Sequence, residues 1–487
     1  MAVDTLLRTM LISVITPSST SRSAPTEIIV VDIAINRKRE SEAKDEEEEG
    51  ILEGLHFDGD GDKSFDATMR AFAALLREAN ASTHSGKECT SKTTVKAWWQ
   101  QRFRLDTALK AQLADIEESV LGVFRCLLIP HFRSKQSKML IHSLCDALVT
   151  AINDYLARKT NGAYLPTCAV SEQKSSKVLL FRKVLQRMVM GYAAQTENEN
   201  ELGDAEIERG VAHIFGVAQY GAHLVRKLAE TVKQHTAAAT KKYAAKLNLR
   251  EMEPLILSLG DALTHIPWES VPVLLSLSCA PSVCRIPCLE FAALRVFELG
   301  SKANSKECPR QHFILNPKGD LVKTEQRFTR LLNDEWTGIK GVIPTAAQFR
   351  DGVENNDVFL YVGHNGGEEF VSCSVLATLS VRAITFLMGC SSGLLRKKGH
   401  FVAKGIANYY LVASCPIIVA NLWDVTDKDI DQFSCQMLRK SVLKRGELVD
   451  VAKAVSESRA VCKLKYLNGA APICYGIPYH LIHGVVV

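Results

Sequence analysis

The spacing of apolar residues divides the chain into a helical part and a later part of short strands. Between about Phe65 and Asn248 apolar residues recur at steps of three and four positions. Such spacing is typical of helices that bury one face. The clearest run places these residues on one face: Leu105, Leu109, Leu113, Ile116, Val120 and Leu121. We therefore expect residues 61–250 to form a helical region, with an exposed polar linker near 195–210.

After about Leu255 the apolar residues gather in short runs of strand length. These runs are "HFILN", "DVFLYVG", "AITFLMG" and "PIIVANLW". Stretches with a helical pattern lie between or after them, at Glu325–Asn333, Phe401–Leu411, Asp427–Leu443 and Leu448–Lys463. Alternating strands and helices are typical of a mostly parallel sheet with helices on its faces. The sequence thus predicts an α/β domain over residues 251–487, preceded by the helical region.

The first sixty residues differ in composition from the rest. A segment rich in Ser, Thr and Pro is followed by the charge block "RKRESEAKDEEEEG". We expect residues 1–60 to form a disordered tail. The stretch "DGDGDKSF" begins like a calcium loop, but Lys63 stands where the sharp turn needs Gly, and Met69 where a bidentate Glu is needed. It is predicted to be an acidic turn.

Composition excludes several broad classes of protein. The 487 residues carry a net charge of +5 with Lys and Arg scattered, so no sequence-specific nucleic-acid binding is expected. The 14 cysteines lack disulfide-like pairing, and Cys279, Cys284 and Cys288 match no common zinc spacing. No apolar run reaches the roughly 18 residues of a membrane span. We expect a protein of the cytoplasm and nucleus that needs no metal or organic cofactor and does not associate with membranes.

Two of the predicted strands end in the same way, one at Gly363-His364 and the next at Gly389-Cys390. Ligands of parallel sheets bind beyond the carboxyl ends of the strands, and right-handed crossovers make successive strands neighbours. A thiolate is a nucleophile, and an imidazole can assist its attack. Backbone N–H groups at Gly363, Asn365 and Gly389 are candidates to bind an oxyanion. Either side chain alone would more often be structural, but their joint placement favours a catalytic dyad.

Several segments together resemble the separase family, caspase-like cysteine endopeptidases that open cohesin rings at anaphase. They are Trp98–Pro130, "IPWESVP", "FILNPKGDLVKTE", "MGCSSGLL", "NLWDVTDKDID" and "LKYLNGAAPICYGIP", in the order of the family. The resemblance implies a caspase-like fold with His364 and Cys390 as the dyad. It also implies cleavage after Arg in E-x-x-R sequences, a cohesin kleisin subunit as substrate, and an inhibitory securin that occupies the cleft.

A pocket for the substrate arginine needs carboxylates to hold the guanidinium. The segment "ANLWDVTDKDID" offers Asp424, Asp427 and Asp431, of which we favour Asp427 and Asp431, with Trp423 as a wall or as a core residue. Acidic residues also suit the first turn of a helix, and Thr426 with Asp429 could form a helix cap, so at least one acid is expected to be structural.

One motif departs from the family. Where the family has Gly-His-Gly, then Ser or Ala, then Gly, this chain has Gly363-His364-Asn365-Gly366-Gly367. Asn accepts left-handed backbone angles better than most residues. The long N-terminal helical repeats of most family members are also not found in this sequence. Both departures motivate an alternative function, a catalytically weak or inactive scaffold that binds securin or cohesin. A nucleotide-binding loop at "GHNGG" is a weaker alternative, because the Lys-Ser/Thr of a phosphate cradle is absent.

The stretch "DAEIERG" has Glu206 three residues before Arg209, inside the predicted linker. This resembles the cleavage pattern of the family, and we predict autocleavage after Arg209. A Glu and an Arg at this spacing also form helix ion pairs, which is the structural alternative.

Two residues of "IPWESVP", Trp268 and Glu269, could line a cleft or serve the core. We expect the structural role for both.

Overall fold

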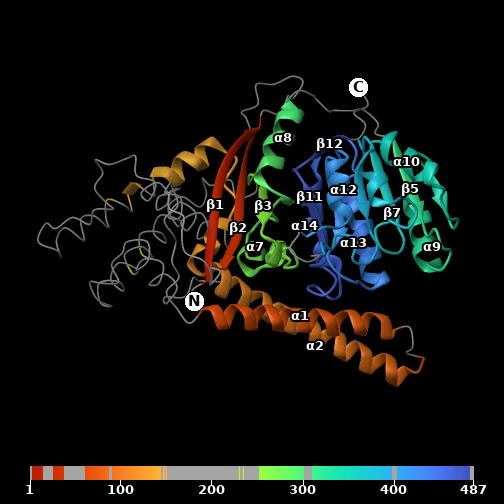
Figure 1. The fold of residues 1–487 in the computed structure, drawn as a ribbon, viewed down its shortest axis with the longest axis horizontal. Coiled ribbons are helices and arrows are strands. Elements are labelled where there is room, and N and C mark those ends of the chain that lie inside the picture. Colours follow the sequence, from red (N-terminus) through yellow and green to blue (C-terminus); the bar gives the residue numbers. More distant parts are fainter. Residues whose placement is uncertain are drawn as a thin grey trace, which may run out of the picture.

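The computed structural model describes residues 3–14, 26–37, 61–86, 90–143, 252–300, 310–396 and 403–482, with a few single positions between 146 and 234. A ten-stranded sheet forms its centre (Figure 1). In spatial order the strands are β1 (Val3–Val14), β2 (Thr26–Arg37), β3 (Leu255–Leu259), β4 (Val283–Ile286), β11 (Pro472–Gly476), β9 (Ile417–Asn421), β8 (Ile384–Leu387), β7 (Val358–Val362), β5 (Gln311–Leu315) and β6 (Trp336–Lys340).

The sheet consists of two parallel blocks. Strands β2, β3, β4 and β11 run parallel to one another, and so do β9, β8, β7, β5 and β6. The blocks meet where β11 pairs antiparallel with β9, and β1 adds an antiparallel strand at one edge. The predicted α/β class with a mostly parallel sheet is confirmed.

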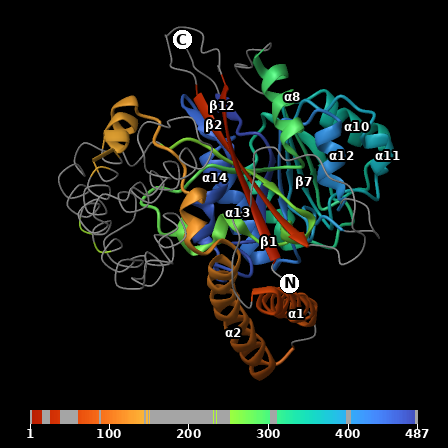
Figure 2. The ribbon, with the colours of Figure 1, turned by 60° about the vertical axis from the view of Figure 1, so that its left-hand side comes forward.

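Helices cover both faces of the second block. On one face lie α9 (Val322–Leu331) and α13 (Asp427–Lys440), with α14 (Val451–Ser458) beside α13 over β4 and β11 of the first block. On the other face lie α10 (Ala346–Glu354), α11 (Cys373–Leu376) and α12 (Ile406–Val412) (Figure 2). Strands with covered faces are mostly apolar and buried, as β7 is along its whole length and β9 is up to the buried Asn421 at its end. Four expected strands and the helices near α9, α12 and α13 are therefore found.

A helical hairpin lies beneath the sheet domain, formed by α1 (Gly61–Ser85) and α2 (Lys92–Ile116) (Figure 1). Ser91 and Thr94 form a reciprocal capping box at the start of α2. The predicted apolar face is buried, since Leu105, Leu109, Leu113, Ile116 and Leu121 are almost inaccessible to solvent. Residues 135–143 are helical, while the helix predicted at Val178–Met190 and the linker at 195–210 lie outside the described residues.

The prediction of a disordered tail over residues 1–60 is wrong where β1 and β2 lie. Strand β2 pairs with β3 along Ile29–Ile33 and with β1 on its other side. Its sequence "TEIIVVDIAINR" is rich in β-branched residues, which fit a pleated sheet. The flanking Ser/Thr/Pro and charged segments dominated the composition and concealed this local strand pattern.

The single helix predicted over Leu448–Lys463 is also wrong at its start. Residues Leu448–Asp450 form β10, which pairs with β12 (His480–Ile482). Asp450 then caps α14 by accepting a hydrogen bond from Lys453 N. A pairing strand that far along the chain is invisible to local periodicity.

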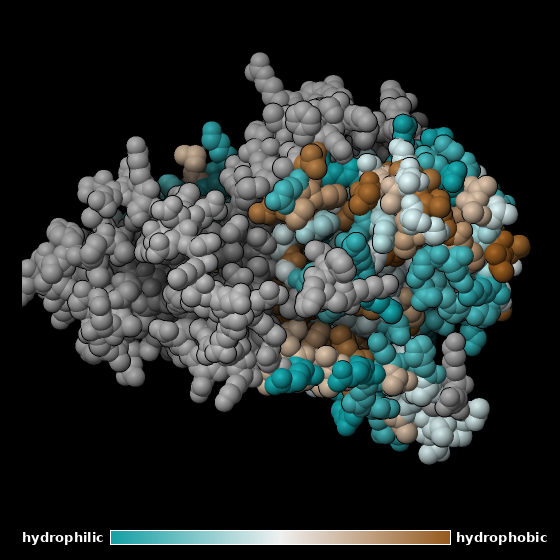
Figure 3. Space-filling model, viewed as in Figure 1, coloured by the Kyte–Doolittle hydropathy of each residue, from teal (hydrophilic) through white to brown (hydrophobic). Residues whose placement is uncertain are grey.

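The surface of the described residues mixes hydrophilic and hydrophobic side chains in the view of Figure 3, as protein surfaces usually do. Among the described residues, no helix has both the length and the apolar character needed to span a bilayer.

Candidate active site

His364 and Cys390 follow the carboxyl ends of two adjacent parallel strands. β7 precedes His364, β8 precedes Cys390, and the strands pair with Tyr361 opposite Leu387. Met388 N extends the ladder by donating to Tyr361 O over 2.9 Å. The two strand ends are therefore adjacent, as the sequence predicted.

The turn that carries His364 packs directly on the turn that carries Cys390. A Cβ atom placed on Gly389 would collide with the carbonyl oxygens of Asn365 and Gly363. Asn365 adopts a left-handed conformation with φ of 52°, as the sequence allowed for an Asn at this position. Gly389 is thus required by the close approach of the two loops.

His364 is oriented by a carboxylate that the sequence analysis did not select. Its Nε2 lies 2.7 Å from Oδ2 of Asp320, and the Tyr361 hydroxyl donates to His364 O over 2.7 Å. The side chains are 34% and 51% exposed for His364 and Asp320. Nδ1 makes no hydrogen bond to the residues that the structure describes, so it is the ring nitrogen available to a thiol or a substrate.

Asp320 could have been found from its position after the run "HFILN". That run forms β5, which pairs in parallel with β7, so both loops leave the same edge of the sheet. A carboxylate on an imidazole nitrogen fixes the ring and stabilises its protonated form.

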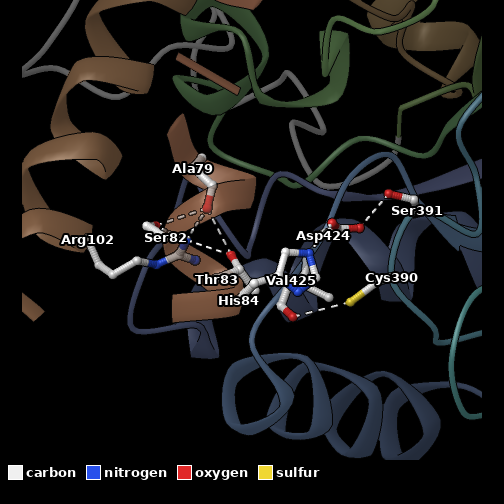
Figure 4. Close-up of polar contacts among 9 residues, drawn as sticks. All are labelled: Ala79, Ser82, Thr83, His84, Arg102, Cys390, Ser391, Asp424 and Val425. Carbon is white, nitrogen blue, oxygen red and sulfur yellow. Dashed lines mark hydrogen bonds and ion pairs between the residues drawn. The ribbon is translucent and has the colours of Figure 1, made fainter. Parts of the chain in front are cut away.

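Cys390 is half-buried and is held by the loop that follows β9. Its thiol donates to the carbonyl oxygen of Val425, with Sγ and O 3.4 Å apart (Figure 4). Asn421 Nδ2 donates to Gly389 O over 3.0 Å, and Ser391 N donates to Trp423 O over 3.2 Å. These bonds fix the position of the turn that carries Cys390 relative to β9.

Among the four candidates for the arginine pocket, Asp424 bonds through its side chain to Ser391, the residue after Cys390. Its Oδ1 accepts from the Ser391 hydroxyl over 2.6 Å, and its Oδ2 lies 3.1 Å from Nε2 of His84 at the end of α1 (Figure 4). The contact with Ser391 places a carboxylate beside the residue that follows the thiol.

The other three candidates lie in different settings. Asp427 is exposed at the first residue of α13, whereas Trp423 is buried and donates through Nε1 to Leu467 O over 2.7 Å. Asp431 is buried and accepts from Thr324 and Arg327 of α9. Burial raises the pKa of Asp431 to about 6, against the opposing effect of those partners. Its carboxylate holds α13 to α9, and the pocket role of all four residues stays a prediction.

Trp268 and Glu269 have the structural roles expected for them. Trp268 is fully buried and donates to Leu263 O over 3.0 Å, and Glu269 pairs with the buried Arg285. Among the described residues no cluster of three or more His, Cys, Asp or Glu side chains is arranged to hold a metal ion.

A mostly parallel sheet between helices, with a histidine and a cysteine beyond adjacent strands, is the arrangement of the caspase-like class of cysteine protease. The family model described as the protease domain of separin matches residues 25–430. The chain therefore belongs to the separase, or separin, family of cysteine proteases.

Curated relatives and solved structures agree with this assignment. Separins of Emericella nidulans and Schizosaccharomyces pombe are 32% and 31% identical over 84% and 88% of this chain. The chain spans 20% and 23% of the length of those two relatives. A crystal structure of the Saccharomyces cerevisiae separase-securin complex matches with a TM-score of 0.66 and 23% identity, over 86% of this chain and 27% of that one. That likeness supports the caspase-like fold.

Proposed function

We propose that this chain is a cysteine endopeptidase that cleaves after arginine in E-x-x-R sequences. Its proposed substrate is a cohesin kleisin subunit, whose cleavage releases sister chromatids at anaphase. The observation that carries the proposal is the packing of the His364 and Cys390 turns at one edge of the sheet, with Asp320 on the imidazole.

The proposed mechanism begins when the Cys390 thiol gives its proton to Nδ1 of His364. The thiolate attacks the carbonyl carbon of the substrate arginine, and backbone N–H groups of the Gly363–Asn365 and Gly389–Cys390 turns stabilise the oxyanion. His364 then protonates the leaving amine, and water hydrolyses the thioester. Asp320 supports the protonated imidazole in both half-reactions.

Within this proposal Asp424 is the first choice for the carboxylate that binds the substrate guanidinium. Its link to Ser391 keeps it beside the turn that carries Cys390, and it is partly accessible. Asp427 is the second choice, because it is exposed at the start of α13, directly after the loop that contains Asp424. Asp431, favoured by the sequence, would have to leave Arg327 first.

Cleavage of a fluorogenic E-x-x-R peptide tests the proposal, with an Arg→Glu peptide and the Cys390→Ser protein as controls. We expect turnover only with the arginine peptide and the unchanged cysteine. Turnover that persists in Cys390→Ser, or that ignores the Arg→Glu change, would refute the assignment.

One observation favours the alternative of an inactive scaffold: Asn365, with φ of 52°, stands where the family has glycine after the histidine, in the turn that would bind the oxyanion. Such a scaffold would bind the substrate peptide without turnover. It would also resist an arginine-directed acyloxymethyl ketone, whereas an active dyad is labelled at Cys390.

We also propose a securin-like inhibitor that occupies the cleft as a pseudosubstrate, in the cytoplasm and nucleus. The likeness to the yeast separase-securin complex supports this partner. An inhibitor of this kind should protect Cys390 from the ketone probe; labelling at an unchanged rate in its presence would contradict the proposal.

Autocleavage after Arg209 is the remaining part of the proposal, and Glu206 and Arg209 lie outside the described residues. Incubation of the purified protein beside Cys390→Ser tests it. We expect a new N-terminus at Gly210 in the first sample only.

A further inference from the structure

We propose that Arg102 and Asn468 are positioning residues for Cys390, acting through the peptide bond between Val425 and Thr426. This inference rests on the proposed function, because it assigns a role in preparing the nucleophile. It also makes the α1–α2 hairpin part of the catalytic unit.

The Val425–Thr426 peptide is held at both of its polar ends. Its carbonyl oxygen accepts the Cys390 thiol at 3.4 Å, and its N–H donates to Oδ1 of Asn468 over 3.3 Å. Because a peptide unit is planar, fixing the N–H fixes the direction of the carbonyl. The side chain of Asn468 therefore sets the acceptor that orients the thiol.

Asn468 is itself fixed on every side. It is fully buried, and its Nδ2 donates to Thr426 Oγ1 over 2.8 Å and to Asp429 Oδ2 over 3.0 Å. Its Oδ1 accepts a second hydrogen bond, from Nη2 of Arg102 over 3.3 Å. A reversed amide would place its NH₂ group against two donors, so the network permits one orientation.

Arg102 connects Asn468 to the α1–α2 hairpin. Its Nη1 donates to Ala79 O over 2.9 Å, to the Ser82 hydroxyl over 2.9 Å and to the Thr83 hydroxyl over 2.8 Å, all in α1 (Figure 4). The residue is only 1% exposed, and burial lowers its pKa to about 10. A buried charge is costly and is tolerated where hydrogen bonds compensate it. The guanidinium thus joins the end of α1 to Asn468 through its two terminal nitrogens, while its buried Nε has no hydrogen-bond partner among the described residues.

A second contact docks the same hairpin on the loop that contains Asn468. Asp106 of α2 accepts from Tyr466 N and Leu467 N, each over 2.8 Å. The Lys463 ammonium also lies 3.9 Å from the ring centroid of Trp99. The loop between Lys463 and Asn468 therefore contacts both the α1–α2 hairpin and the Val425–Thr426 peptide.

The reactivity of the Cys390 thiol tests this inference without any substrate. Alkylation by iodoacetamide is followed at a series of pH values by mass spectrometry of the tryptic peptide that spans 383–396, in which Cys390 is the single cysteine. We compare wild type with Arg102→Leu, Asn468→Leu and the conservative Arg102→Lys. Arg104→Leu is the matched control, since Arg104 is exposed on the same helix and pairs with Glu78.

We expect the half-alkylation pH of Arg102→Leu and Asn468→Leu to fall by roughly half a unit, because the carbonyl acceptor stabilises the protonated thiol and would be misaligned. Peptide turnover should fall about tenfold in kcat with little change in KM, since orientation and not substrate binding is lost. Arg102→Lys should recover part of both, and Arg104→Leu should match wild type. His364, Asp424, Asp429 and His84 are retained in every variant, and Asn468→Leu, which changes no charge, separates misalignment from the loss of the Arg102 cation.

Folded Arg102→Leu or Asn468→Leu protein with a wild-type alkylation profile and wild-type kcat would overturn the inference. If both variants fail to fold, Thr426→Val decides, because it removes the hydroxyl that holds Asn468 beside the peptide; an unchanged profile there refutes the role. Failure of the proposed function is distinguishable, since wild type would then show no turnover while the alkylation profiles still differed.

Discussion

Gly389 has no room for a side chain, because a Cβ atom would lie 1.9 Å from the carbonyl oxygen of Asn365 and 2.7 Å from that of Gly363. The carbonyls belong to the turn that carries His364, and Gly389 precedes Cys390. The separation of the two candidate catalytic loops is therefore set by backbone packed on backbone.

Gly389→Ala should abolish turnover of the arginine peptide and lower the thermal midpoint. The methyl group must push the loops apart, and overpacking of this kind costs about 1–3 kcal/mol or more. Gly446→Ala is the control, because Gly446 has a positive φ of 74° but nothing within 4 Å of its Cβ position. Equal activity in both alanine variants would contradict the expected steric effect.

Asp320→Asn should lower kcat for the arginine peptide by about 10- to 100-fold, with the fold intact. The amide keeps the shape of the side chain but cannot stabilise protonated His364 as a carboxylate does. Steady-state kinetics measures the loss. Asp334→Asn, an exposed carboxylate outside the site, should leave kcat unchanged.

Asp424→Asn should reduce kcat/KM for the arginine peptide by about 10- to 100-fold, because a charge-assisted hydrogen bond is worth roughly 1.5–3 kcal/mol. Asparagine can still accept from Ser391, so the local structure should persist. A larger loss in Asp427→Asn than in Asp424→Asn would instead assign the pocket to Asp427.

As the pH rises from 4 to 7, the free energy of unfolding of wild type should fall relative to that of Asp431→Asn. Burial raises the pKa of Asp431 to about 6 in the folded protein, so the folded state keeps a proton that the unfolded state has lost between those values. The stability that wild type gains from this proton is present below pH 4 and is lost as the pH rises through about 6. Two pKa units correspond to about 3 kcal/mol.

Thermal midpoints of both proteins across this pH range measure that difference. Asparagine does not titrate, so the thermal midpoint of Asp431→Asn should not show the fall near pH 6 that Asp431 causes in wild type. A difference between the two proteins that stays constant from pH 4 to 7 would show that Asp431 keeps an ordinary pKa in the fold.

Glu269→Ala should destabilise the protein by about 3–5 kcal/mol, because it leaves the buried Arg285 guanidinium without its carboxylate. Arg285 retains the carbonyls of Thr264 and Ile266, at 2.7 and 2.6 Å. The double variant Glu269→Leu/Arg285→Met should be less destabilised than Glu269→Ala in urea unfolding. A double variant less stable than the single one would contradict this account.

The sequence alone determined which residues end the central strands. The runs before His364 and Cys390 are apolar except for Thr385 and stop at glycine, and this pattern is local. The apolar face of α2 was likewise visible from its spacing. Family resemblance then assigned the two residues a joint chemistry, since neither motif is specific by itself.

Only the tertiary structure decided what surrounds those two residues. Asp320 lies 44 positions from His364 and Arg102 lies 366 positions from Asn468, so no local pattern connects either pair. The same holds for β2, which gains its place by pairing with β3 across more than two hundred residues of chain. Side-chain periodicity reports which face of an element is buried, whereas partners are chosen by packing and hydrogen bonding between elements, which depend on the whole fold.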